Sequence, residues 1–144
     1  MVAIKSILSI ALLAVTAIAG PIEQRDEKLR CKNSELSRDE NTLTESNARR
    51  QLGASPIHTG RSGYPHAFMN FQGIKFSKKC RNRDLVEYPV FKDKSMVYNF
   101  DSNPKDNPGP FRVIATADSR LYCGVISHDG GNGNPNAGNF HKCE

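Results

Sequence analysis

The placement of four cysteines constrains this 144-residue chain more than any other feature. All four, Cys31, Cys80, Cys123 and Cys143, follow an apolar N-terminal run. An even number of cysteines in an oxidising compartment favours two disulfides, for which three pairings are possible. A zinc site is the alternative, since histidines are also present, but no Cys-x-x-Cys pair and no closely spaced His pair provides the usual ligand spacing. We therefore expect two disulfides, no bound metal and no other cofactor.

The N-terminal run has the features of a secretory signal peptide. Residues 7–15 (ILSIALLAV) follow Lys5 and precede Ala17-Ile18-Ala19, a small-x-small pattern that a signal peptidase accepts. The run is too short and too close to the terminus for a convincing membrane span. We expect residues 1–19 to be a signal peptide, the mature chain to be secreted to the extracellular space, and no stable membrane insertion.

After removal of the leader, the length fits one domain with a single core. Residues 20–30 (GPIEQRDEKLR) are charged and lack periodicity, which predicts a short pro-segment or a loosely held N-terminal arm. The folded domain is then expected over residues 31–144. A basic secreted protein of this size is expected to be a monomer.

Residues 37–53 (SRDENTLTESNARRQLG) predict one amphipathic helix of about three turns. Asp39 or Asn41 can serve as its N-cap, and Gly53 is placed for its end. The apolar residues of its shared face are Leu43, Ala48 and Leu52.

After Gly60 the sequence changes to short segments rich in β-branched and aromatic residues, separated by Pro, Gly, Asn and Asp. One helix followed by several antiparallel strands predicts an α+β fold, with the amphipathic helix packed on a twisted antiparallel sheet. The expected strands are residues 73–76, 85–91, 95–100, 111–117 and 121–128.

Side-chain alternation sorts the polar residues of three of these strands. Glu87 shares a face with Leu85, and Arg112 points to the face opposite that of Phe111 and Val113. In the last of these strands, Cys123 is expected to point away from the face that carries His128. If the three strands belong to one sheet, a carboxylate, a guanidinium and an imidazole converge on its open face.

A base, a fixed cation and an acid suit a metal-free attack on a phosphodiester, and RNA supplies its own nucleophile in the 2′-hydroxyl. The alternative is that each of these residues is a satisfied polar group without a catalytic role. The segment from Arg61 to Arg112 contains ten Lys and Arg against five Asp and Glu. Either a solvated basic face or a polyanionic partner accounts for this excess.

The order of motifs resembles a known family. The chain contains, in sequence, Tyr-Pro-His, Glu-aromatic-Pro, Pro-Gly-Pro-x-Arg-Val-Ile, Cys-Gly-Val-Ile-x-His and Asn-Phe-x-x-Cys. This order resembles the secreted fungal guanyl-specific and purine-preferring ribonucleases, including ribotoxins such as alpha-sarcin, from Cys31 to Cys143. Residues 99–128 look closest to the ribotoxin branch.

The resemblance implies how the reaction proceeds. Glu87 would act as general base on the 2′-hydroxyl and His128 as general acid toward the 5′-oxygen, which gives a 2′,3′-cyclic phosphate. His66 would assist the base electrostatically. Tyr64 would hydrogen-bond the phosphate and Arg112 would neutralise it. The substrate implied is single-stranded RNA, cut on the 3′ side of a purine, with guanine as the expected base.

The same resemblance implies that Phe140 forms an apolar wall against the phosphate, and that the disulfides are Cys31–Cys143 and Cys80–Cys123. In the loop over residues 62–73 (SGYPHAFMNFQG), Phe71 would stack on the base while amides read its edge. The expected substrate-binding residues are Phe68, Asn70, Phe71, Gln72 and Asn139.

Two departures from the family concern selectivity. Gln72 stands where guanine-binding members have an acidic residue, and an amide lacks the charge-assisted bond to the base. The long Lys- and Gly-rich insertion of ribotoxins is reduced here to residues 73–79 (GIKFSKK).

Three hypotheses follow. The first is a secreted, metal-independent endoribonuclease. The second is a ribotoxin-like effector that cleaves ribosomal RNA in the cytosol of a target cell and stops translation. The third is an effector that binds RNA or protein without turnover, against which the presence of Glu87 and His128 argues.

Overall fold

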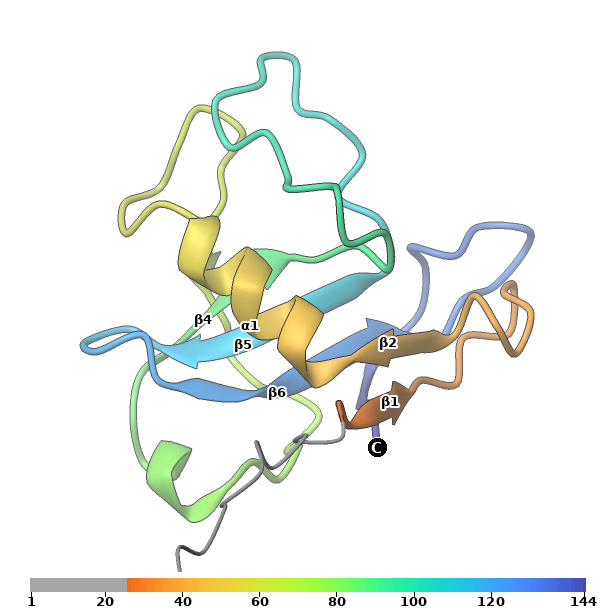
Figure 1. The fold of residues 1–144 in the computed structure, drawn as a ribbon, viewed down its shortest axis with the longest axis horizontal. Coiled ribbons are helices and arrows are strands. Elements are labelled where there is room, and N and C mark those ends of the chain that lie inside the picture. The colour runs from red at the N-terminus through yellow and green to blue at the C-terminus, as the bar shows by residue number, and fades with distance from the viewer. Residues whose placement is uncertain (1–25) are drawn as a thin grey trace, which may run out of the picture.

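The computed structural model describes residues 26–144, so the expected signal peptide and most of the expected N-terminal arm lie outside the described residues. One helix covers one face of a five-stranded antiparallel sheet with strand order β3-β4-β5-β6-β7 (Figure 1). The α+β fold with a helix on an antiparallel sheet, expected from the sequence, is therefore confirmed.

Three long strands form the centre of the sheet, at the positions that the sequence predicts. The predicted strands at residues 73–76 and 95–100 are wrong: both segments are loops. Their apolar residues bury side chains without strand pairing, as Phe76, Tyr98 and Phe100 do. The strands are β3 (His66–Ala67), β4 (Leu85–Pro89), β5 (Phe111–Thr116), β6 (Tyr122–His128) and β7 (Phe140–Lys142).

The helix α1 spans Glu45–Ala54 and begins later than the sequence predicts. The hydroxyl of Thr44 caps it by accepting a hydrogen bond from the backbone N–H of Asn47. The predicted cap Asn41 instead uses its side chain to donate to the carbonyls of Asn33 and Leu36. At the other end, Gly53 lies inside the last turn and Ser55 is the C-cap.

The start of the domain is more ordered than expected. β1 (Lys28–Arg30) pairs antiparallel with β2 (Thr42–Thr44) in a separate two-stranded sheet. Leu29 and Leu43 face each other in this pair, and both are buried in the core. The prediction of a loosely held arm is therefore wrong for residues 28–30, because one leucine in a charged segment is enough to anchor it to the core.

The sheet separates two apolar clusters. The first lies between the sheet and α1, which packs on β5 and β6, and contains Ala48, Leu52, Tyr88, Val113 and Val125. The second lies on the opposite face and contains Phe68, Phe76, Ile114, Ile126 and the Cys80–Cys123 pair, with Leu85 and Phe140 packed against it.

A β-bulge alters the alternation in β6. The register shifts between Ile114 and Ala115, so that Ile114 pairs with Gly124 and Ala115 pairs with Tyr122, which leaves Cys123 without a partner position. Cys123 consequently packs with Ile126 in the second cluster. The prediction that Cys123 points away from the face of His128 is wrong, because strict alternation does not hold across a bulge.

Both disulfides pair as the resemblance implies. Cys31–Cys143 joins the two ends of the domain across a sequence separation of 112 residues. Cys80–Cys123 ties the single-turn 3-10 helix η1 (Lys78–Cys80) to β6. No helix among residues 26–144 is both long and apolar enough to cross a membrane.

Candidate active site

Five of the expected catalytic residues lie on the sheet face opposite α1: His66, Glu87, Arg112, His128 and Phe140. Tyr64 contacts His66 and Arg112 from the loop before β3. Directly opposed residues of antiparallel strands point to the same side, and Glu87 lies opposite His66 on one side and Ile114 on the other. Arg112 is opposite Ile126, two residues from His128. The register therefore brings together the carboxylate, guanidinium and imidazole that alternation predicts for one face.

Glu87 lies at the centre of this face and is 6% exposed. One carboxylate oxygen is 3.4 Å from Nδ1 of His66, and the other is 3.3 Å from Nε of Arg112. The Arg112 Nε makes no aligned hydrogen bond, so this contact is an ion pair. An imidazole and a guanidinium thus flank one carboxylate.

Arg112, which is 3% exposed, is fixed at the beginning of β5. Its Nη1 donates to the carbonyls of Pro108, Gly109 and Phe111 at 3.3, 2.7 and 2.8 Å. Its Nη2 donates to the hydroxyl of Tyr64 at 3.2 Å. Because that hydroxyl is the acceptor, its own proton remains available for an anionic ligand.

Tyr64 also stacks on the ring of His66, with centroids 4.6 Å apart. Burial raises the pKa of Tyr64, which keeps the hydroxyl protonated at neutral pH. The ammonium of Lys105 lies 5.4 Å from the centroid of the same ring. Lys105 was not among the residues predicted from the sequence, since its loop shows no periodicity that places it.

His128 ends β6 and is held in one orientation. Its Nδ1 is 3.0 Å from the carbonyl oxygen of Gly138, and a carbonyl can only accept, so Nδ1 bears a proton. This leaves Nε2 as the nitrogen that can exchange a proton with a ligand. The ring packs on Phe140, its opposite residue in β7, with centroids 3.9 Å apart.

The environment shifts the pKa values of Glu87 and His128 toward each other. Burial raises the pKa of Glu87, an effect that His66 and Arg112 oppose. Burial also lowers the pKa of His128; the bond to Gly138 opposes this shift, whereas Arg112 reinforces it. A carboxylate that accepts a proton more readily and an imidazolium that releases one more readily suit a base and an acid.

A third histidine, His141, holds β7 to the residue that follows His128 and was not among the site residues predicted from the sequence. Nδ1 of His141 is 2.7 Å from the carboxylate of Asp129, and its Nε2 accepts from the backbone N–H of Lys32 at 2.7 Å. Asp129 follows His128, and His141 follows Phe140. This contact would have been foreseeable only with β7 and its register, which the sequence did not indicate.

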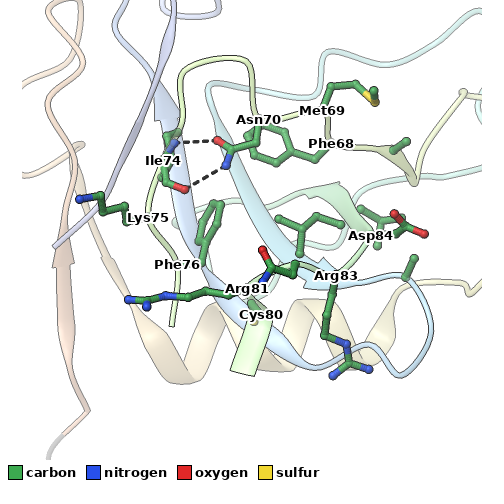
Figure 2. A pocket seen from close by; sticks show the side chains of 15 residues that line it. Phe68, Met69, Asn70, Ile74, Lys75, Phe76, Cys80, Arg81, Arg83 and Asp84 are labelled. Atoms are coloured by element: carbon green, nitrogen blue, oxygen red, sulfur yellow. Dashed lines mark hydrogen bonds between the residues drawn. The ribbon is translucent and has the colours of Figure 1, made fainter. Parts of the chain in front are cut away.

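The loop after β3 differs in part from its expected roles. Asn70 was expected to read a base edge, but its side chain bonds both the N–H and the carbonyl of Ile74, at 2.8 and 2.9 Å (Figure 2). Phe68 is buried in the second cluster and packs edge-on against Phe76 and Phe140. The side chains of these two residues are engaged within the protein and shape the loop.

Two other residues of this loop, Phe71 and Gln72, have exposed side chains. Phe71 is 87% exposed, so its ring is available for stacking. The amide of Gln72 points toward the side chain of Asn139, with 3.5 Å between Nε2 and Oδ1. Both residues are exposed; Gln72 follows the edge strand β3 and Asn139 precedes the other edge strand, β7, so their side chains meet across the sheet. Within residues 26–144, no group of three or more His, Cys, Asp or Glu is placed to hold a metal ion.

Comparison with known proteins gives a consistent result. Residues 24–144 match the family model described as ribonuclease. A ribonuclease from Arthroderma benhamiae is 40% identical, with 100% of both chains covered. Ribonuclease alpha-sarcin from Aspergillus giganteus is 34% identical over 89% of this chain and 93% of its own. The guanyl-specific ribonuclease F1 of Fusarium fujikuroi is 32% identical, with 96% and 94% covered.

Solved structures agree with these matches. The Aspergillus ribotoxin restrictocin superposes with a TM-score of 0.66 at 31% identity, covering 81% of this chain and 99% of its own. Restrictocin in complex with a 29-mer sarcin/ricin domain RNA analogue superposes with a TM-score of 0.64 at 30% identity, with the same coverage.

Proposed function

Since the chain belongs to the ribonuclease family that includes fungal ribotoxins and guanyl-specific ribonucleases, and is therefore a ribonuclease, we propose that it is a secreted, metal-independent endoribonuclease. Its substrate is single-stranded RNA, which it cuts on the 3′ side of a purine, guanine in particular. The observation that carries the proposal is the buried Glu87 carboxylate between His66 and Arg112, on the same sheet face as His128.

In the proposed reaction, Glu87 removes the proton from the 2′-hydroxyl, whose oxygen attacks the adjacent phosphorus. Arg112 and the Tyr64 hydroxyl offset the charge that develops on the phosphoryl oxygens. Nε2 of His128 gives its proton to the departing 5′-oxygen, and the product is a 2′,3′-cyclic phosphate. Phe140 packs on the ring of His128 and borders the phosphate on its apolar side.

The test of base selectivity uses four dinucleoside phosphates that differ only in the nucleotide on the 5′ side of the cleaved bond. With the protein lacking residues 1–19 and a chelator present, we expect cleavage after G and A to exceed cleavage after C and U. Comparable cleavage after all four bases would contradict the proposed purine selectivity.

The pH dependence of kcat/KM should be bell-shaped and narrow. Glu87 must be ionised and its pKa is raised above the ordinary 4.5, so the acidic limb is expected above pH 4.5. His128 must be protonated and its pKa is lowered below the ordinary 6.5, so the basic limb is expected below pH 6.5. Measured on a dinucleoside phosphate, the maximum should lie between these two values. A plateau extending through pH 8 would contradict the assignment of His128 as the acid.

Asn70 should support base recognition indirectly. Asn70→Ala removes both bonds to Ile74, each of which contributes about 1 kcal/mol, so we expect KM to rise about tenfold and the purine preference to weaken. Asn70→Asp keeps the acceptor for the Ile74 N–H and should give an intermediate KM. An Asn70→Ala protein with unchanged KM for all four dinucleoside phosphates would show that the loop does not depend on these bonds.

A second candidate function is a ribotoxin-like effector that cleaves ribosomal RNA inside a target cell. It is favoured by the similarity to restrictocin, one structure of which contains a sarcin/ricin domain RNA analogue. Intact ribosomes treated with the protein would then yield one discrete RNA fragment and stop translating. Many fragments of random length would favour the general endoribonuclease.

A further inference from the structure

A cavity of about 770 Å³ lies at the edge of the sheet, beside the loop that carries Phe71 and Gln72 (Figure 2). Phe68, Phe76 and Leu85 give it apolar surface. Its size is that of small-molecule and cofactor sites, which range over about 300–1,000 Å³. None of the catalytic residues of the proposed reaction lines this cavity.

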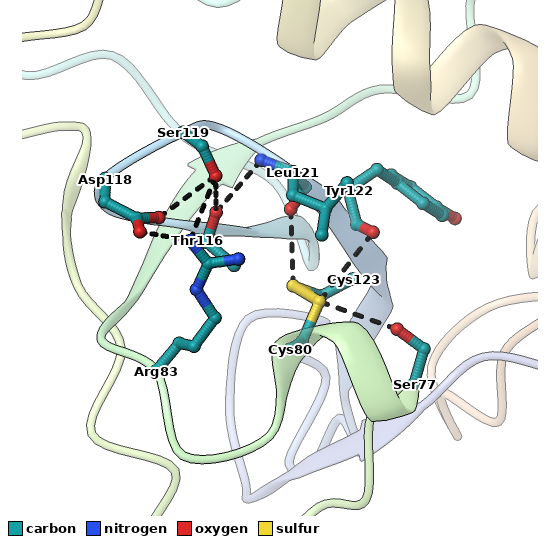
Figure 3. Close-up of a disulfide and its surroundings, with 9 residues drawn as sticks. All are labelled: Ser77, Cys80, Arg83, Thr116, Asp118, Ser119, Leu121, Tyr122 and Cys123. Carbon is teal, nitrogen blue, oxygen red and sulfur yellow. Dashed lines mark hydrogen bonds and ion pairs between the residues drawn. A yellow bond between two sulfur atoms is a disulfide. The ribbon is translucent and has the colours of Figure 1, made fainter.

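The charged residues that line the cavity are mainly cationic. Lys75, Arg81 and Arg83 line it, against one carboxylate, that of Asp84. Arg83 also forms an ion pair with Asp118, which fixes its position in the wall (Figure 3). Lys75 and Arg81 are exposed. A ligand with a flat apolar part and an anionic part matches this combination.

The walls of the cavity are held in place before any ligand arrives. Cys80 lines the cavity and is joined to Cys123 in β6 by a disulfide (Figure 3). On another side, the bonds between Asn70 and Ile74 close the loop that forms the wall. A preformed site loses less free energy in ordering itself around a ligand.

The cavity adjoins the catalytic residues through two strands. Phe68 and Leu85 line it, belong to the second cluster, and lie two residues from the paired His66 and Glu87, on the same face of the sheet. Two residues of a strand advance about 7 Å, so an RNA strand bound at Glu87 can reach the cavity with a further nucleotide.

We propose that this cavity is a second nucleotide-binding subsite, which holds a nucleotide of the same RNA strand that lies outside the two nucleotides flanking the cleaved bond and next to one of them. The base lies against the apolar surface and the phosphate faces Lys75 and Arg81, as in other single-strand binding sites that combine stacking with basic grooves. This inference rests on the proposed endoribonuclease function.

Two substrates separate the subsite from the catalytic site: a dinucleoside phosphate, which is too short to fill the cavity as well, and an RNA of eight nucleotides with the same cleaved bond. The Lys75→Glu/Arg81→Glu double variant reverses the charge. Ala117→Trp, at an exposed lining residue, fills the cavity without changing charge. Lys28→Glu, at an exposed position of β1, is the control for a charge reversal at a residue that does not line the cavity.

The subsite predicts that both cavity variants raise KM for the octamer about tenfold and change the kinetics on the dinucleoside phosphate less than twofold, whereas Lys28→Glu changes neither. Unchanged KM for the octamer, equal losses of kcat/KM on both substrates, or an equal loss with Lys28→Glu would overturn the subsite.

A binding experiment separates failure of the subsite from failure of the proposed function. If the unsubstituted protein cleaves neither RNA, the proposed function fails, and the subsite is judged by binding of a 2′-deoxy octamer. Changes in the methyl chemical shifts of Ile74, Leu85 and Ala117 when the 2′-deoxy octamer is added would support the subsite. Unchanged shifts would overturn it.

Discussion

Replacing Glu87 by Gln is expected to lower kcat/KM about 10²- to 10⁴-fold, the usual contribution of a general base. The amide has the size of the carboxylate but cannot take a proton from the 2′-hydroxyl. The acidic limb of the pH profile should disappear with the carboxylate, which loss of folding alone would not cause. Glu35→Gln, at an exposed carboxylate, is the matched control and should retain full activity.

The thermal unfolding of the Glu87→Gln protein needs to be measured beside its kinetics. The substitution leaves Arg112 buried without its anionic partner, and breaking a buried pair costs about 3–5 kcal/mol. A folded variant that still cleaves RNA with an intact acidic limb would exclude Glu87 as the base.

Replacing His128 by Ala is expected to produce a loss of similar size, about 10²- to 10⁴-fold, on ordinary RNA, because the departing 5′-oxygen no longer receives a proton. The loss should be much smaller on a nucleoside 3′-aryl phosphate, whose leaving group departs without protonation. Glu87→Gln should be impaired on both substrates. The measurement is kcat/KM for each variant on each substrate.

The leaving-group comparison separates the acid from a residue that only supports the fold. If His128→Ala lowers kcat/KM equally on both substrates, then His128 does not act as the acid. His58→Ala, at an exposed histidine outside the site, is the control and should show neither effect.

The sequence predicted the central part of the site because strand alternation and antiparallel register obey simple rules. Glu87, Arg112 and His128 occupy three adjacent strands without an irregularity between them and the residues opposite, so their common face could be inferred. The face on which Cys123 lies could not be inferred, since the bulge at Ala115 has no clear sequence signal.

The other failures have two different causes: a tertiary contact sets the start of the helix, and a local side-chain interaction holds Asn70. Thr44 rather than Asp39 or Asn41 caps the helix because Leu43 pairs with Leu29 in the small sheet and extends the chain up to the cap. In the sequence, Asn70 is a polar loop residue that is expected to be exposed. In the structure its backbone is left-handed, with φ 48°, and its side chain bonds to Ile74.

The most direct test of the central claim concerns the chemistry of the product ends. An RNA with one guanosine, incubated with the protein lacking residues 1–19 in the presence of a chelator, should give an upstream fragment ending in a 2′,3′-cyclic phosphate. The same RNA with a 2′-deoxy nucleotide at that guanosine should remain intact. Mass spectrometry of both reactions decides the matter: cleavage of the 2′-deoxy RNA, or a product ending in a 3′-hydroxyl, would contradict attack by the 2′-hydroxyl.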